Sequence, residues 1–111
     1  MFTVRRSLCV AVSGALLCGW ALAAEPEFAL VIKNHRFEPA ELKVPAGQRV
    51  KLIVDNQDGT AEEFESHSLN REKVIPGGTK AAIFIGPLKP GRYTFFGEYH
   101  EKTAQGAIVA E

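Results

Sequence analysis

Short apolar runs with a two-residue period, separated by turn residues, most constrain what this chain can fold into. The alternation is clear in residues 28–32 and again in residues 50–54, and Pro- and Gly-containing turns occupy residues 45–47 and 75–78. Such spacing predicts strands and no helices of useful length. The expected strands cover residues 28–32, 42–44, 50–54, 63–69, 81–85, 93–95 and 107–110. We therefore predict an all-β fold, a Greek-key β-sandwich of seven to eight strands.

Residues 1–24 have a different composition from the rest of the 111-residue chain. Two arginines precede the apolar run Leu8–Leu22, and small residues follow it up to Ala24. A positively charged N-terminal stretch, a short apolar segment and small residues before a cleavage site are typical of a secretory signal peptide. A membrane anchor needs about 18 or more apolar residues, and this run is shorter. We predict cleavage after Ala23 or Ala24, one domain over residues 25–111, and a periplasmic protein without a membrane anchor.

The predicted leader contains both cysteines, Cys9 and Cys18, and the single methionine, Met1. The mature domain would therefore have no thiol or disulfide and must fold on its apolar core alone. The whole chain has 13 Lys+Arg and 13 Asp+Glu, so losing the leader's two arginines leaves a net charge of about −2. Nucleic-acid binding needs a basic face, and we predict none here.

Several motifs, taken in order, resemble a cupredoxin-like domain. They lie in NHRFEPAELKVPAGQRVKLIVDNQD, residues 34–58, and PGRYTFFGEYHEKTAQGAIV, residues 90–109. That family's frame has an early Phe-x-Pro, a Pro-x-Gly turn, a strand ending in Asn, and Pro-Gly-x-Tyr-x-Phe before a metal loop. Within it, residues 62–78 (EEFESHSLNREKVIPGG) and 95–100 (FFGEYH) are most similar to periplasmic proteins of bacterial ferrous-iron uptake systems.

The resemblance implies a periplasmic protein that binds copper or iron and assists ferrous-iron uptake, by delivery or by oxidation. A periplasmic iron-binding protein and a membrane permease are the implied partners. Blue-copper members hold their metal with one histidine, a Cys-x-x-His motif and a methionine. Here His100 matches the second histidine of that set, but Gly97 stands at the cysteine position. Glu63 or Glu65 lies near the position where the family has its first histidine. A lasting blue-copper centre requires the thiolate, so we exclude that centre.

The remaining metal-binding side chains are carboxylates and imidazoles. Alternation along a strand over residues 63–69 would turn its acidic residues to one face and Phe64 toward the core. The family frame brings that strand beside the 98–100 loop. Carboxylates with imidazole suit iron, copper(II), manganese or zinc. The predicted metal ligands are His100, Glu98, Glu63, Glu65, His67 and His35.

Less specific interpretations stand beside this one. An acidic strand face is often simply solvated, and Glu72 is expected to pair with its neighbours Arg71 and Lys73. The alternative function is a metal-free β-sandwich module that docks a periplasmic protein partner, because a fold alone does not determine function. The chain has none of the nucleophile motifs of hydrolases. We therefore expect a binding protein, with metal-dependent iron oxidation left open.

Overall fold

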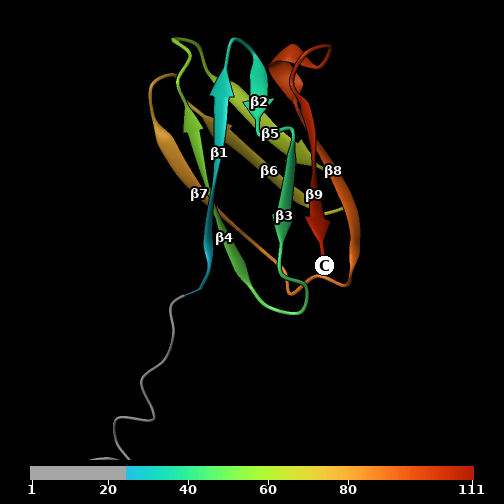
Figure 1. Ribbon diagram of the computed structural model, residues 1–111. Helices are drawn as coiled ribbons and strands as arrows, with labels where there is room; N and C mark the ends of the chain where they lie inside the picture. The colour runs from blue at the N-terminus through green and yellow to red at the C-terminus, as the bar shows by residue number, and fades with distance from the viewer. Residues whose placement is uncertain (1–24) are drawn as a thin grey trace, which may run out of the picture.

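The computed structural model describes residues 25–111, so the predicted leader lies outside the described residues. Within them the chain is a β-sandwich of two packed sheets (Figure 1). The strands are β1 (Glu27–Lys33), β2 (Arg36–Glu38), β3 (Glu41–Val44), β4 (Val50–Asn56), β5 (Glu62–Ser66), β6 (Arg71–Ile75), β7 (Lys80–Ile85), β8 (Gly91–Gly97) and β9 (Gln105–Ala110). A short 3-10 helix, η1 (Glu98–His100), follows β8. Among the described residues, no helix has the length and apolar character needed to cross a membrane.

The two sheets have the crossed connections of a Greek-key sandwich. One sheet has the order β2-β1-β4-β7 and the other β3-β9-β8-β5-β6. The pairs β1–β4 and β3–β9 are parallel, and the remaining pairs are antiparallel. Since β4 and β5 lie in different sheets, the chain crosses the sandwich between them. This crossing, the β1–β2 turn and η1 all lie at one end of the molecule (Figure 1).

The core lies between the sheets and follows the alternation of the strands. Three aromatic rings from β2, β5 and β8 meet at its centre: Phe37 and Phe95 edge to face at 4.9 Å, and Phe64 and Phe95 stacked at 5.0 Å. The aliphatic part of the core consists of Leu30, Ile32, Val44, Val50, Leu52, Val54, Ile75, Ile83, Ile85 and Ile108. The all-β prediction is thus confirmed, and Phe64 faces the core as its position in the alternation predicts.

The structure differs from the expected strands in two places. Nine strands form within residues 25–111, because the short strands β2 and β6 were not expected. The expected strand over residues 63–69 is wrong in its second half, where a turn replaces it. Ser66 is buried, and its hydroxyl donates to the Thr94 carbonyl and accepts the Leu69 N–H. These bonds end β5, and Asn70, with a φ of 55°, turns the chain into β6.

The central aromatic cluster predicts a large effect for one substitution. Phe64→Ala should lower the free energy of unfolding by about 3–5 kcal/mol, because it leaves a cavity between Phe37 and Phe95. Val74→Ala on the neighbouring strand should change it by about 0.5 kcal/mol or less, since Val74 is 45% exposed. Urea denaturation of both variants measures the difference. Equal effects would contradict this packing.

Candidate metal centre

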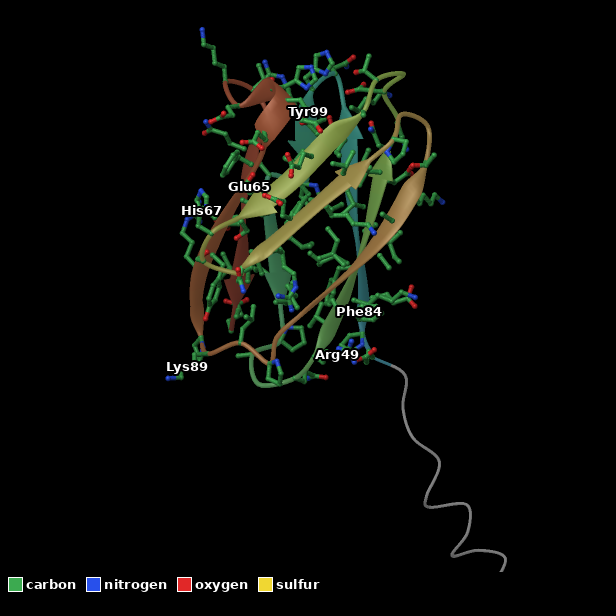
Figure 2. All side chains as sticks on the ribbon, turned by 180° about the vertical axis from the view of Figure 1, so that it is seen from behind. Arg49, Glu65, His67, Phe84, Lys89 and Tyr99 are labelled. Atoms are coloured by element: carbon green, nitrogen blue, oxygen red, sulfur yellow. The ribbon has the colours of Figure 1, made fainter. Side chains whose placement is uncertain are left out.

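Strand β5 presents two chemically different faces. Glu62, Phe64 and Ser66 are buried, whereas Glu63 and Glu65 alternate with them on the outer face of the five-stranded sheet. Figure 2 shows Glu65 on this face, with Tyr99 at the end of the sandwich where η1 lies. One strand therefore contributes carboxylates to two separate places.

Three carboxylates meet on the outer face. One carboxylate oxygen each from Glu63, Glu65 and Glu72 lie within 4.8 Å of one another, and within residues 25–111 they are the one such group of three or more possible ligands. Glu72 reaches them because it lies directly opposite Glu65 in the β5–β6 register. Glu98, from η1, lies near enough to Glu63 and Glu65 to raise the pKa values of both carboxyl groups. We call these four residues the acidic cluster.

The proximity of these carboxylates changes their titration. The neighbouring side chain of Glu98, partial burial and the charge of Glu72 raise the pKa of Glu63 to about 7. Burial and the charge of Glu98 raise the pKa of Glu65. One oxygen of Glu65, Oε1, is buried and has no hydrogen-bond partner among the described residues. An orphaned carboxylate oxygen beside other carboxylates is what a bound cation would satisfy.

Within residues 25–111, no lysine or arginine forms an ion pair with the acidic cluster. The lysines and arginines that form ion pairs in the described part of the chain do so with Glu25, Glu27 and Glu41. Arg71, beside the cluster in sequence, instead donates Nε to the Phe84 carbonyl at 2.8 Å. The expected pairing of Glu72 with Arg71 or Lys73 is therefore wrong.

A buried carboxylate organises the loop end of the sandwich. Glu62 is 2% exposed, and its Oε1 accepts the N–H groups of Tyr99 at 2.9 Å and Glu63 at 3.0 Å. Its Oε2 lies 2.8 Å from Nδ1 of His100. These contacts tie η1 to the first residues of β5 and thereby fix the position of Glu98.

The second histidine at this end is held by a different carboxylate. Asp58 accepts the N–H groups of Asn34 at 2.7 Å and His35 at 2.9 Å, and its Oδ2 lies 3.4 Å from Nδ1 of His35. The His35 N–H first, then the Asn34 N–H and the histidine charges, lower the pKa of Asp58. The His35 ring stacks on that of His100, with 3.6 Å between centroids and 10° between planes.

The residues present do not fit a blue-copper centre. Residues 25–111 contain neither cysteine nor methionine. A Cβ atom added at Gly97 would lie 2.6 Å from both Cδ and Oε2 of Glu62, and 2.8 Å from Cβ of Ala104. The Glu62 carboxylate thus fills the volume that a thiolate at position 97 would need, and Nδ1 of His100 faces that carboxylate.

The six predicted ligands fall into separate groups. Glu63, Glu65 and Glu98 belong to the acidic cluster, and His35 and His100 stack at the loop end. His67 follows the end of β5, and its Nδ1 lies 3.9 Å from Oε2 of Glu65 with the side chain 81% exposed (Figure 2).

Besides Glu72, two residues that shape the centre were missing from the predicted set. Glu62 and Asp58 were not among the predicted ligands. The sequence signal for Glu62 was its place two residues before Phe64, on the same face of the strand. For Asp58 it was the Asn-Gln-Asp-Gly turn, where an aspartate often accepts backbone N–H groups.

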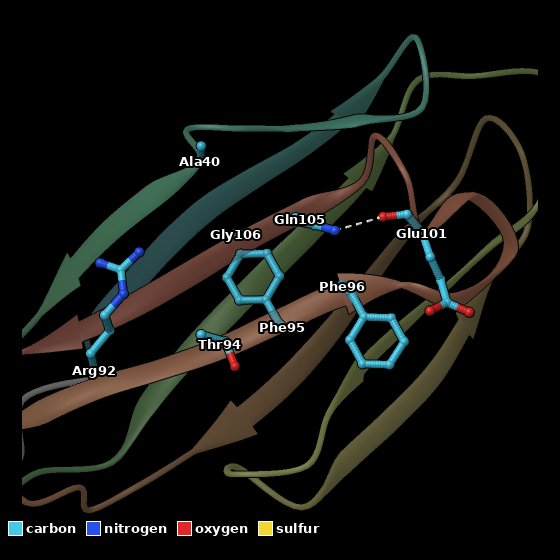
Figure 3. Close-up of a pocket in the computed structure, with 8 residues that line it drawn as sticks. All are labelled: Ala40, Arg92, Thr94, Phe95, Phe96, Glu101, Gln105 and Gly106. Atoms are coloured by element: carbon cyan, nitrogen blue, oxygen red, sulfur yellow. Dashed lines mark hydrogen bonds between the residues drawn. The ribbon is translucent and has the colours of Figure 1, made fainter.

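A groove on the same sheet is separate from the candidate metal centre. It has a volume of about 480 Å³, lies over β8 and β9, and is lined by Ala40, Arg92, Thr94, Phe95, Phe96, Glu101, Gln105 and Gly106 (Figure 3). Arg92 is engaged by Glu41, and the Gln105 side chain donates to the Glu101 carbonyl. Arg92 and Gln105 thus already have partners, and we place the candidate centre elsewhere.

Comparison with known proteins agrees with the fold. The cupredoxin-like domain family matches residues 7–110, so the chain belongs to this family. An uncharacterized protein of Rickettsia prowazekii (strain Madrid E), RP394, is 46% identical over 83 residues, which are 75% of this chain and 66% of that protein. The chain thus spans just under two thirds of the length of this relative.

Solved structures show the same architecture at low sequence identity. Auracyanin A, a blue copper protein from Chloroflexus aurantiacus, has a TM-score of 0.68 and 15% identity, covering 79% of this chain and all of that chain, 100%. A chain of a heme-copper terminal oxidase dimer has a TM-score of 0.65 and 22% identity, covering 78% of this chain and 65% of that chain. At these identities the likeness concerns the fold alone.

The raised pKa of Glu63 predicts a pH-dependent stability of the metal-free protein. Its pKa is about 7 in the folded state, compared with an ordinary value of 4.5. Between pH 4.5 and pH 7, the folded state therefore keeps a proton on Glu63 that the unfolded chain has released. The free energy of unfolding should therefore fall as pH rises from about 4.5 to about 7. Glu63→Gln should make this decrease smaller in urea denaturation at pH 5 and pH 8, leaving the part that comes from Glu65. Glu38→Gln, an exposed control, should keep it, and parallel profiles for Glu63→Gln and wild type would refute the assignment.

Proposed function

We propose that this protein binds a metal cation, iron or copper, at the acidic cluster. The observation that carries the proposal is the convergence of Glu63, Glu65 and Glu72 within 4.8 Å, with Oε1 of Glu65 buried and unpaired. Bringing carboxylates together without lysine or arginine partners costs free energy, which their raised pKa values reflect. A bound cation would reverse that cost.

The donor chemistry supports iron more than copper at this place. All four members of the acidic cluster offer carboxylate oxygens, which are hard donors. Hard oxygen donors stabilise iron(III) over iron(II), whereas copper is better served by imidazole or thiolate. Oxidation of bound iron(II) would require an electron acceptor such as dioxygen or a second metal. We therefore propose binding and delivery of the metal as the primary role.

The cellular role that we propose is in ferrous-iron uptake. The likeness of residues 62–78 and 95–100 to periplasmic proteins of such systems supports it, together with the carboxylate donors of the acidic cluster. The protein would act in the periplasm after removal of residues 1–24. It would pass its metal to a periplasmic iron-binding protein or to a membrane permease.

Loss of one carboxylate should weaken metal binding. We expect Glu65→Gln and Glu98→Ala to lower affinity for iron(II) and copper(II) by about tenfold or more, comparable with the loss of a group that supports a metal ligand. Anaerobic isothermal titration calorimetry measures this directly. Glu38→Gln should bind as wild type does. Unchanged affinity in both cluster variants would exclude the acidic cluster as the site.

Thermal denaturation separates this proposal from the docking alternative. A ligand that binds only the folded state raises the melting temperature, by an amount that grows with its concentration. Iron(II), copper(II), manganese(II) or zinc(II) should therefore raise the melting temperature of wild type. An absence of any shift with all four ions would favour a metal-free module that docks a periplasmic protein.

The uptake role can be tested by growth on limiting ferrous iron. A strain lacking the gene should grow more slowly than its parent, and the wild-type gene should restore growth. A gene carrying Glu63→Gln and Glu65→Gln should fail to restore it, whereas Glu38→Gln should succeed. Normal growth of the deletion strain would refute the uptake role, and full rescue by the double variant would refute this site for it.

A further inference from the structure

The imidazole of His67 lies beside the acidic cluster, just beyond the end of β5. Glu63 and Glu65 face outward along this strand, and position 67 is the next one in the same two-residue period. Nδ1 of His67 lies 3.9 Å from Oε2 of Glu65. This distance is too long for a hydrogen bond, but two bonds of about 2.0–2.2 Å each to one shared ion would span it. A small rotation of the side chains would therefore let both atoms contact the same ion.

The ring of His67 is free to make that rotation. Its side chain is 81% exposed, and it lies on the same face as Glu65 (Figure 2). On one side it is bordered by the ring of Phe96, with 5.6 Å between centroids and 49° between planes. Phe96 lies directly opposite Glu65 in the β5–β8 register, so this contact keeps the imidazole close to the Glu65 carboxylate.

A hollow of about 280 Å³ opens where these groups meet. Its walls include Glu65, Glu72 and His67, so two members of the carboxylate triad and one imidazole border the same space. The buried oxygen of Glu65 without a hydrogen-bond partner, Oε1, belongs to this set. An ion held here could exchange with solvent through the hollow, and its remaining coordination positions would be open to water.

The turn that carries His67 is held by bonds that do not use the imidazole. The Asn70 N–H donates to the His67 carbonyl at 3.1 Å, and the Ser66 hydroxyl accepts the Leu69 N–H at 3.1 Å. The His67 side chain can therefore be replaced while the turn is kept. A loss of metal affinity on its replacement would report on the imidazole itself.

Given the metal site proposed above, we propose that His67 is a further ligand of the acidic cluster, and that it selects a borderline divalent ion such as iron(II) over magnesium(II) and calcium(II). Carboxylate oxygens alone also suit magnesium(II) and calcium(II). Imidazole nitrogen, in contrast, suits iron, copper and zinc. One nitrogen ligand among carboxylates thus gives the site a preference that the carboxylates alone would not provide.

Calorimetric titration of His67→Gln with two kinds of ion tests this selectivity. Affinity for zinc(II), and for iron(II) under anaerobic conditions, should fall by about tenfold or more, whereas affinity for calcium(II) should stay within about twofold. Ser68→Ala, in the same exposed turn, should match wild type for all three ions. The melting temperature of metal-free His67→Gln should equal that of wild type, because the replaced side chain is on the surface.

Nuclear magnetic resonance of the imidazoles gives a second readout, because the whole chain has only three histidines. Zinc(II) added to wild type at equimolar concentration should shift the His67 signals and fix its ring as the Nε2–H tautomer, since Nδ1 is the nitrogen beside Glu65. His35 and His100 at the loop end serve as internal references.

Glu65→Gln separates a failure of this role from a failure of the metal site. This variant should weaken zinc(II) and calcium(II) binding alike, because both ions use its carboxylate. If it does so while His67→Gln binds zinc(II) as wild type does, or while zinc(II) leaves the His67 signals in place, the role of His67 is refuted and the acidic cluster stands. Equal losses for zinc(II) and calcium(II) in His67→Gln would refute the selectivity. Unchanged affinities in both variants would refute the acidic cluster itself.

Discussion

The hydrogen bonds of one buried carboxylate, that of Glu62, determine how the functional end of this sandwich is built. A carboxylate that is 2% exposed would be strongly unfavourable without partners. Glu62 has three: two backbone N–H groups and Nδ1 of His100. Because two of them belong to η1, the loop after β8 is fastened to β5 by the same bonds that make the buried charge tolerable. The positions of His100 and Glu98 both follow from this attachment.

The two-residue period of β5 places neighbouring side chains of this strand in two separate polar groups. Glu62 and Glu63 are neighbours in the chain, yet one faces the interior beneath η1 and the other faces outward. Imidazole nitrogen therefore gathers at the end of the sandwich, and carboxylate oxygen on the face of the five-stranded sheet. Strand geometry thus keeps the carboxylates of the acidic cluster apart from the residues at the loop end.

Strand alternation explains how much of this could be predicted from the sequence. The inward direction of Phe64 and the outward direction of Glu63 and Glu65 follow from the period alone, and they are correct. The same rule places Glu62 in the interior. A buried glutamate is expected, however, only where hydrogen-bond partners for its carboxylate can be identified. Its partners Tyr99 and His100 lie 37 and 38 residues away, beyond any local pattern.

Long-range register accounts for the other differences. Glu72 joins the acidic cluster because β6 pairs with β5 opposite Glu65, and a short exposed strand such as β6 has no apolar alternation to reveal it. Asp58 reaches the His35 turn from the end of β4, through a crossing that sequence patterns do not place in space. Local chemistry was therefore predictable, whereas the grouping of the ligands was not.

The residue at position 97 and the residue at position 62 are physically coupled. A cysteine at 97 would bring its Cβ to 2.6 Å from the Glu62 carboxylate, so a thiolate there and a buried glutamate at 62 exclude each other unless the backbone moves. Gly97 therefore does two things. It removes the cysteine ligand of a blue-copper centre, and it leaves room for the Glu62–His100 hydrogen bond. Once Glu62 occupies that space, Nδ1 of His100 is committed to the interior and only Nε2 faces outward. A cupredoxin-like frame with this pair therefore has no room for a thiolate at position 97, and its closely spaced carboxylates lie on the outer face of the five-stranded sheet instead.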